Sequence, residues 1–197
     1  MTPQLWLGDL APPRMWVHIP VEDPRAAAFY DDHYSRQTVG AKGLMGPGRR
    51  FLLWHEVAGG NALWGINYAL DPVGAYQFRN VIFRNVSPTR SSELIRAATV
   101  ETFALWERRY KRLPDEPLIT EIGIAETAAR RSRRSIPGAC YAHAGWEMLR
   151  LVPKAHGRSA KAIYTQRGSD PWEAFARQWL LIGSWMLIDQ PARITSR

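Results

Sequence analysis

The chain has 197 residues, of which 46% are hydrophobic and 22% charged, an ordinary globular composition that is long enough for one substantial core. Its 26 Lys and Arg exceed its 18 Asp and Glu, so the net charge is +8, which favours a polyanionic partner but also fits a generally basic protein. A single cysteine, Cys140, excludes an intramolecular disulfide and a zinc site built from several cysteines.

The N-terminus MTPQLWLGDLAPPRMW has no basic region followed by an apolar run. Nowhere does the chain reach the roughly eighteen consecutive apolar residues that a membrane-spanning helix needs. We therefore expect a cytoplasmic protein without a membrane segment.

The first half of the chain predicts a strand, a helix and a hairpin. RMWVHIPV (14–21) is typical of a strand, and DPRAAAFYDDHY (23–34) of a short helix with Asp23 as N-cap and Pro24 in its first turn. Residues 49–70 form two apolar runs around the turn sequence AGGN, which predicts a hairpin. Between helix and hairpin lies a glycine-rich segment, and long irregular segments in compact domains are usually functional or disordered.

The second half alternates between strands and helices. The run 76–86 has a period of two and predicts a strand, and the amphipathic run 87–113 has a Ser/Thr-rich start and predicts a helix. The remaining expected elements are a strand at 117–125, a short helix closed at Gly145 and a strand within 136–152, a strand at 162–166, and an apolar helix at 170–188.

This order predicts an α/β or α+β fold, with one domain over residues 1–197 and a mixed central sheet flanked by helices. Residues 153–197 would form a C-terminal extension. The apolar helix within it, at 170–188, fits the core or the interface of a homodimer better than a catalytic role.

The junction NVSPTRSSELIRAA runs from a strand through a polar turn into a helix. Such a junction presents backbone N–H groups and the positive end of the helix dipole to an anion such as phosphate. Ser and Thr at this place can also simply cap the helix, and no glycine-rich phosphate-binding motif accompanies them.

The stretch from Cys140 to Trp146, with its Tyr-x-x-x-Gly-aromatic spacing, resembles the last helix of the GNAT acyltransferase superfamily. The resemblance implies a GNAT-like fold that binds acetyl-CoA, with Tyr141 beside the sulfur and protonating the leaving thiolate. On the same resemblance the strand–helix junction holds the pyrophosphate of the cofactor. The residues expected there are Arg84, Asn85, Val86, Arg90, Ser91 and Ser92.

A closer resemblance is carried by short motifs that occur in a fixed order. These motifs are His33-Tyr34-Ser35-Arg36-Gln37, Gly46-Pro47-Gly48-Arg49-Arg50, Ile82-Phe83-Arg84-Asn85, Ser91-Ser92-Glu93-Leu94-Ile95, Pro137-Gly138-Ala139-Cys140-Tyr141 and Ala144-Gly145-Trp146. In this order they resemble phage-encoded Mom-like DNA-modification proteins, over about residues 29–150.

That resemblance implies a transferase that uses acetyl-CoA to modify the exocyclic amine of adenine in double-stranded DNA. The mark would be of the carbamoylmethyl or acetamido type and would shield phage DNA from restriction enzymes. His33, Tyr34 and Ser35 would lie at the active site. His33 is the expected general base, because imidazole titrates near neutral pH, and Asp31 or Asp32 would orient it. A histidine that only caps its own helix is the alternative.

The strand at 117–125 departs from this family. Relatives often carry Thr-x-Val-Asp-Pro there, whereas this chain has Thr120-Glu121-Ile122-Gly123-Ile124, so Gly123 occupies the position of the aspartate. Glu121 or Glu126 would then supply the carboxylate, or the chemistry is altered. His33, His55 and nearby carboxylates could bind a metal ion such as iron, but their spacing matches no recognised metal motif.

Arginines supply the expected DNA contacts. The run TAARRSRRS places like charges close together, which repel unless an anion compensates them. The residues assigned to DNA are Arg36, Arg49, Arg50, Arg130, Arg131, Arg133 and Arg134. Modifying a paired base requires flipping it out of the stack, and Tyr34 or Trp146 could receive it while the glycine-rich segment closes over it.

Two other functions stay open. One is an acetyltransferase that acts on the amine of a small molecule or a protein and does not bind DNA. The other is a DNA-binding protein without enzymatic activity on a decayed acyltransferase fold, an alternative that the glycine at position 123 keeps open.

Overall fold

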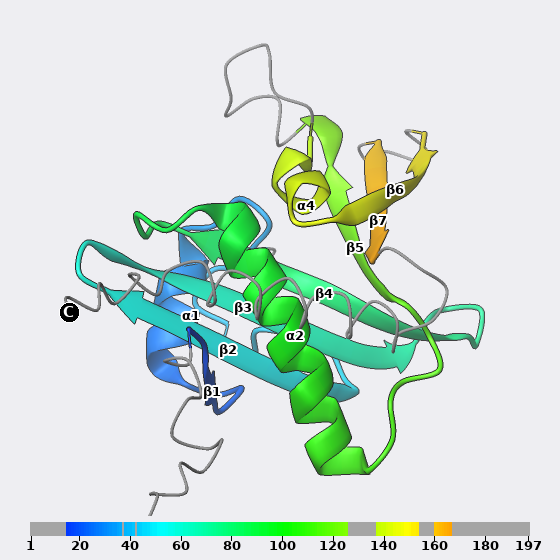
Figure 1. The fold of residues 1–197 in the computed structure, drawn as a ribbon, viewed down its shortest axis with the longest axis horizontal. Coiled ribbons are helices and arrows are strands. Elements are labelled where there is room, and N and C mark those ends of the chain that lie inside the picture. The colour runs from blue at the N-terminus through cyan, green and yellow to red at the C-terminus, as the bar shows by residue number, and fades with distance from the viewer. Residues whose placement is uncertain (1–14, 37, 42, 126–136, 154–159, 167–197) are drawn as a thin grey trace, which may run out of the picture.

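A computed structural model describes residues 15–36, 38–41, 43–125, 137–153 and 160–166. These residues form a mixed α/β structure with a seven-stranded sheet in the order β1-β2-β3-β4-β5-β7-β6 (Figure 1). The strands are β1 (Val17–Ile19), β2 (Arg49–Val57), β3 (Gly60–Leu70), β4 (Tyr76–Asn85), β5 (Leu118–Gly123), β6 (Trp146–Val152) and β7 (Lys161–Gln166). The helices are α1 (Pro24–Asp31), α2 (Ser91–Tyr110) and α4 (Ala139–His143).

The predicted order of elements agrees with this structure, with shifts at several boundaries. The strand expected at 14–21 is limited to β1, since Pro20 follows it and has no N–H for a further ladder bond. The helix expected at 23–34 ends at Asp31, so His33 lies in the turn after α1. The expected C-terminal helix at 170–188 lies outside the described residues.

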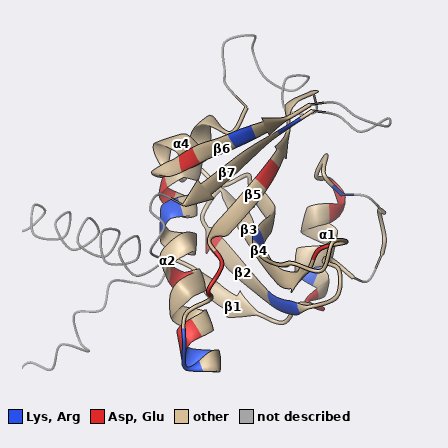
Figure 2. Cartoon of the chain, turned by 90° about the vertical axis from the view of Figure 1, so that its right-hand side faces the viewer, with Lys and Arg blue, Asp and Glu red and all other residues tan. Residues whose placement is uncertain are grey.

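Helices α1 and α2 cover opposite faces of the sheet (Figure 2). On the α2 face the core contains the indole of Trp64, whose N–H donates to Thr102 Oγ1 at 3.0 Å. On the α1 face a smaller cluster contains Leu52, Leu63 and Ile82. Because both faces are covered, β2 and β3 have apolar runs that are buried on both sides.

Strands β4 and β5 are the one parallel pair among the described strands, and α2 connects them. Their register extends only from Phe78↔Leu118 to Asn80↔Thr120. Beyond these residues β4 continues its pairing with β3 and β5 its pairing with β7, so the two strands diverge (Figure 1). The sheet therefore has an opening at this point.

A β-bulge lies on β4 at the start of the opening. Gly65 pairs with Ile82 and Ile66 with Asn80, so Val81 is an extra residue without a partner in the β3–β4 ladder. A Cβ on Gly65 would lie 2.9 Å from the Ile82 Cβ, so the close approach of the strands here requires glycine. The bulge changes the direction of β4 and turns the side chain of Val81 to the surface.

Candidate functional site

A cavity of about 410 Å³ occupies the opening between β4 and β5. The turn after α1 forms one wall, and β5 with α4 forms the opposite wall. All the catalytic residues expected from the sequence line it: His33, Tyr34, Ser35, Glu121 and Tyr141. Residues 33 and 141, far apart in the chain, thus share one cavity.

The hydroxyl of Ser35 connects two aromatic side chains in the first wall. Ser35 Oγ lies 2.7 Å from His33 Nδ1 and 2.7 Å from the Tyr30 hydroxyl oxygen. The backbone N–H of Ser35 also donates to His33 Nδ1, at 3.3 Å, so this nitrogen is an acceptor and carries no proton. It follows that the Ser35 hydroxyl donates to His33 and the Tyr30 hydroxyl donates to Ser35.

The two aspartates expected to orient His33 both have partners of their own. Asp31 accepts hydrogen bonds from Arg36 and from the backbone N–H of Gly40, and Asp32 lies 3.8 Å from Arg84. Ser35 holds Nδ1 of the His33 ring through its hydroxyl and its backbone N–H. Any proton that reaches Nδ1 from the cavity along these bonds passes through the Ser35 hydroxyl.

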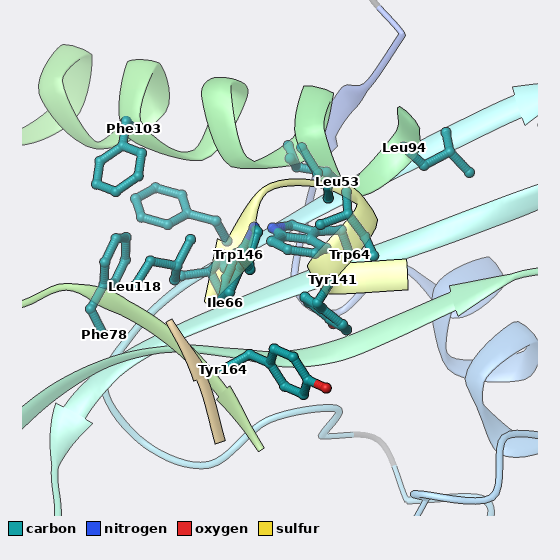
Figure 3. Close-up of a cluster of buried hydrophobic side chains, with 14 of the residues drawn as sticks. Leu53, Trp64, Ile66, Phe78, Leu94, Phe103, Leu118, Tyr141, Trp146 and Tyr164 are labelled. Atoms are coloured by element: carbon teal, nitrogen blue, oxygen red, sulfur yellow. The ribbon is translucent and has the colours of Figure 1, made fainter. Parts of the chain in front are cut away.

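Tyr141 lies in the second wall, with its ring in the hydrophobic core beside Trp64 and Trp146 (Figure 3). Its hydroxyl donates to Asn80 Oδ1 at 2.5 Å. Burial, together with the nearby Cys140, raises the pKa of Tyr141 well above its usual value of 10. The phenol is therefore neutral over the whole physiological range.

Asn80 is the residue that sequence reasoning missed. Its Nδ2 donates to the carbonyls of Gly65 and Ile82, at 3.1 and 2.8 Å, which satisfies carbonyl groups beside the bulge. These two bonds fix the orientation of the amide, so Oδ1 must face Tyr141. A polar residue at a position that alternates with the buried Phe78 and Ile82 was the available signal.

Glu121 is an ion-paired carboxylate on the β5 side of the cavity. Lys161 Nζ lies 2.7 Å and Arg79 Nη1 3.7 Å from its oxygens. Burial alone would raise its pKa, but the hydrogen bond from Lys161 and the two cations outweigh burial, and the pKa of Glu121 is lowered. Glu121 and Gly123 line the same cavity, so a carboxylate is present close to the position of the missing aspartate.

Only part of the expected cofactor set lines the cavity: Arg84, Asn85, Val86 and Ser91 do, and Arg90 and Ser92 do not. Arg84 stacks on Phe29 and donates to its carbonyl, which ties β4 to α1. Asn85 organises the turn into α2: its Nδ2 donates to Thr89 O and Ser91 Oγ, and its Oδ1 accepts from Ser87. Arg90 occupies the N-cap position but makes no side-chain cap hydrogen bond.

The described arginines of the expected DNA surface make contacts within the chain, and two of them face opposite sides of the sheet. Arg36 has a side chain only 5% exposed and bonds to Asp31 and the carbonyls of Ala41 and Gly43. Adjacent strand residues face opposite ways: Arg49 stacks on Tyr110 of α2, and Arg50 lies 3.9 Å from Glu22. Residues 130–134, with their arginines, lie outside the described part of the chain, as does Glu126.

The described residues contain no group of three or more His, Cys, Asp and Glu that could hold a metal ion. His55 is buried, with Nδ1 2.7 Å from the Met15 carbonyl oxygen, and it does not line the cavity with His33. The part of the chain that the structure describes therefore brings together no set of ligands for the iron considered from the sequence. Within the same part of the chain, every helix is too short or too polar to cross a membrane.

No protein-family model, curated protein or solved structure matches the chain.

Proposed function

We propose that this protein is an acetyl-CoA-dependent transferase with a GNAT-type fold, acting on the exocyclic amine of adenine in DNA. The observation that carries the proposal is the convergence of the His33–Ser35 turn and Tyr141 on one cavity. The strand order, the divergence of the parallel pair β4 and β5, and the bulge in β4 support the fold assignment. The Mom-like motifs support the choice of DNA adenine.

The cavity offers groups that fit acetyl-CoA. Val86 and Ser91 line it at the start of α2, where first-turn backbone N–H groups have no acceptor within the helix. The N-cap residue Arg90 makes no side-chain cap hydrogen bond, and the positive end of the helix favours a phosphate. When bound, the cofactor would supply an activated acetyl group next to Ser35 and Tyr141.

Ser35 and His33 would remove the proton from the attacking amine. The nitrogen forms a bond to the acetyl carbon while the carbon–sulfur bond breaks and the electron pair leaves on sulfur. The Ser35 hydroxyl accepts the amine proton and passes its own proton to His33 Nδ1, along the 2.7 Å hydrogen bond. Adenine is a weak nucleophile, because its amine lone pair is delocalised, so positioning supplies much of the rate.

Tyr141 would stabilise the leaving sulfur by a hydrogen bond. A cysteine-type thiol has a pKa of about 8.5, well below that of the buried phenol, so full proton transfer from Tyr141 to the thiolate is unfavourable. Rotation of the hydroxyl away from Asn80 presents its proton to the sulfur. The direct product of these steps is an acetylated amine; a carbamoylmethyl mark contains another nitrogen and requires a further reactant.

Mass spectrometry of nucleosides from cells that express the chain tests the proposal. We expect a modified adenosine that is absent with H33A. An unchanged nucleoside profile from well-folded wild-type protein would contradict it.

Transfer to the amine of a small molecule or a protein is the second candidate. It is favoured by the burial of the Arg36 side chain and by the opposite orientation of Arg49 and Arg50 on β2. Binding to duplex DNA that weakens steeply with salt would favour DNA, whereas acetyl-CoA binding without DNA binding would favour this alternative.

A further inference from the structure

A second cavity, of about 390 Å³, adjoins the first. Ser35 and Val81 line both cavities, so the catalytic serine and the residue of the bulge stand at their junction. The second cavity extends from there between Tyr30, the β3 residue Asn67 and the described part of the segment 38–46.

Arg36 holds one wall of the second cavity in place. Its guanidinium donates to Asp31 at 2.8 Å, to the Gly43 carbonyl at 2.9 Å and to the Ala41 carbonyl. Asp31 in turn accepts from the backbone N–H of Gly40 at 3.1 Å. The described residues of this segment are thus tied to the end of α1, so the wall exists before a ligand binds.

The amide of Asn67 also forms part of the wall of the second cavity. Asn67 lines it, and Asn67 Oδ1 is buried without a hydrogen-bond partner among the described residues. Gly46 and Gly48 pack against this amide: a Cβ on Gly48 would lie 2.7 Å from Oδ1. A Cβ on Gly46, which lines the cavity, would lie 3.8 Å from Nδ2, so Nδ2 is the amide atom on the cavity side. Leu44 and Met45 add an apolar surface.

We propose that the second cavity receives the acceptor base, a planar nitrogen heterocycle with an exocyclic amine, while the first cavity holds the acetyl donor. This inference rests on the proposed function and assigns its second substrate a place. The amide of Asn67 lines the wall beside the base, and Ser35 Oγ at the junction takes a proton from the amine. The amine then faces the acetyl group across Ser35.

Two tryptophan substitutions separate this cavity from the surface around it. Thr38 is exposed and lines the cavity, so Thr38→Trp fills it without disturbing the core. Val39, the next residue, is 72% exposed and does not line the cavity, so Val39→Trp is the matched control. The probes are labelled DNA duplexes with one unpaired adenine or with an abasic site in its place, measured by fluorescence anisotropy.

We expect the wild type and Val39→Trp to bind the adenine duplex about tenfold more tightly than the abasic duplex, and Thr38→Trp to lose this preference. Acetyl-CoA binding, measured by calorimetry, should be unchanged in both variants. A preference that persists in Thr38→Trp, or that the wild type lacks, overturns the inference. If only Thr38→Trp loses the preference, the result supports this cavity as the site of the base. If the wild type then transfers no acetyl group, the cavity stands and the proposed reaction is refuted.

Discussion

The two walls of the main cavity are built in different ways. His33 and Ser35 lie in the turn after α1, and Tyr30 lies in the last turn of α1 itself. The hydrogen bonds among these three residues span two to five positions of the chain. On the opposite side, Tyr141 of α4 bonds to Asn80 of β4, which is 61 residues away in the chain, and both are almost fully buried. The first wall can change with little effect on the fold, whereas the second is part of the core.

This difference predicts which substitutions affect folding and which affect only activity. The largest effect on folding is expected for Asn80→Ala, which leaves two carbonyls and the Tyr141 hydroxyl buried without their partner. The free energy of unfolding should fall by about 3 kcal/mol, measured by denaturant titration. Val81→Ala, next to it on the surface, should change it by less than about 0.5 kcal/mol. Equal effects would contradict a structural role of the Asn80 amide.

The largest effect on activity alone is expected in the first wall. Ser35→Ala should lower kcat about 100-fold with little loss of stability, because it interrupts the path to His33 Nδ1. Ser35→Thr retains a hydroxyl and should keep most of the activity. The double variant with His33→Ala should be no slower than Ser35→Ala alone, since the two residues act as a unit. If the losses of kcat in the two single variants multiply in the double variant, His33 and Ser35 act independently.

Tyr141→Phe is expected to affect both activity and stability. It keeps the ring in the core but removes the hydroxyl that donates to Asn80. We expect kcat to fall about tenfold and the free energy of unfolding by about 1 kcal/mol. Steady-state kinetics and thermal denaturation measure both. Full activity would remove Tyr141 from the reaction.

The smallest expected effect is on the stability of the fold at low pH, through Glu121. Because its pKa is lowered in the folded protein, its ionised form stabilises the fold above its ordinary value of 4.5. This contribution is lost as the pH falls below that value, when the carboxylate takes up a proton. Glu121→Gln should therefore flatten the decline of stability below about pH 4.5, measured by denaturant titration across pH. An unchanged decline would show that other carboxylates cause it.

The order of strands and helices could be predicted from the sequence because hydrophobic periodicity and turn residues are local signals. The β2–β3 hairpin and α2 agree with their patterns. The end of α1 could not be predicted, since DDHY contains no glycine or proline to end a helix. The turn that holds His33 and Ser35 was therefore not foreseen.

Two features of the site depend on how the strands are oriented and paired in the folded protein. Arg49 and Arg50 look like one basic patch in the sequence, but strand geometry sends them to opposite faces. The role of Asn80 depends on a bulge that forms only when β3 and β4 pair. The sequence of β4 contains no glycine that would indicate this bulge. The only local signal of either feature is the polar Asn80 between Phe78 and Ile82, and it does not reveal the bulge.

The most direct test of the central claim is the transfer of isotope-labelled acetyl from acetyl-CoA to duplex DNA by the purified protein, followed by nucleoside mass spectrometry. Labelled adenosine should form with the wild type and Ser35→Thr and be about 100-fold less with Ser35→Ala. If the wild-type protein is folded and binds acetyl-CoA but the adenosine carries no label, the claim is contradicted.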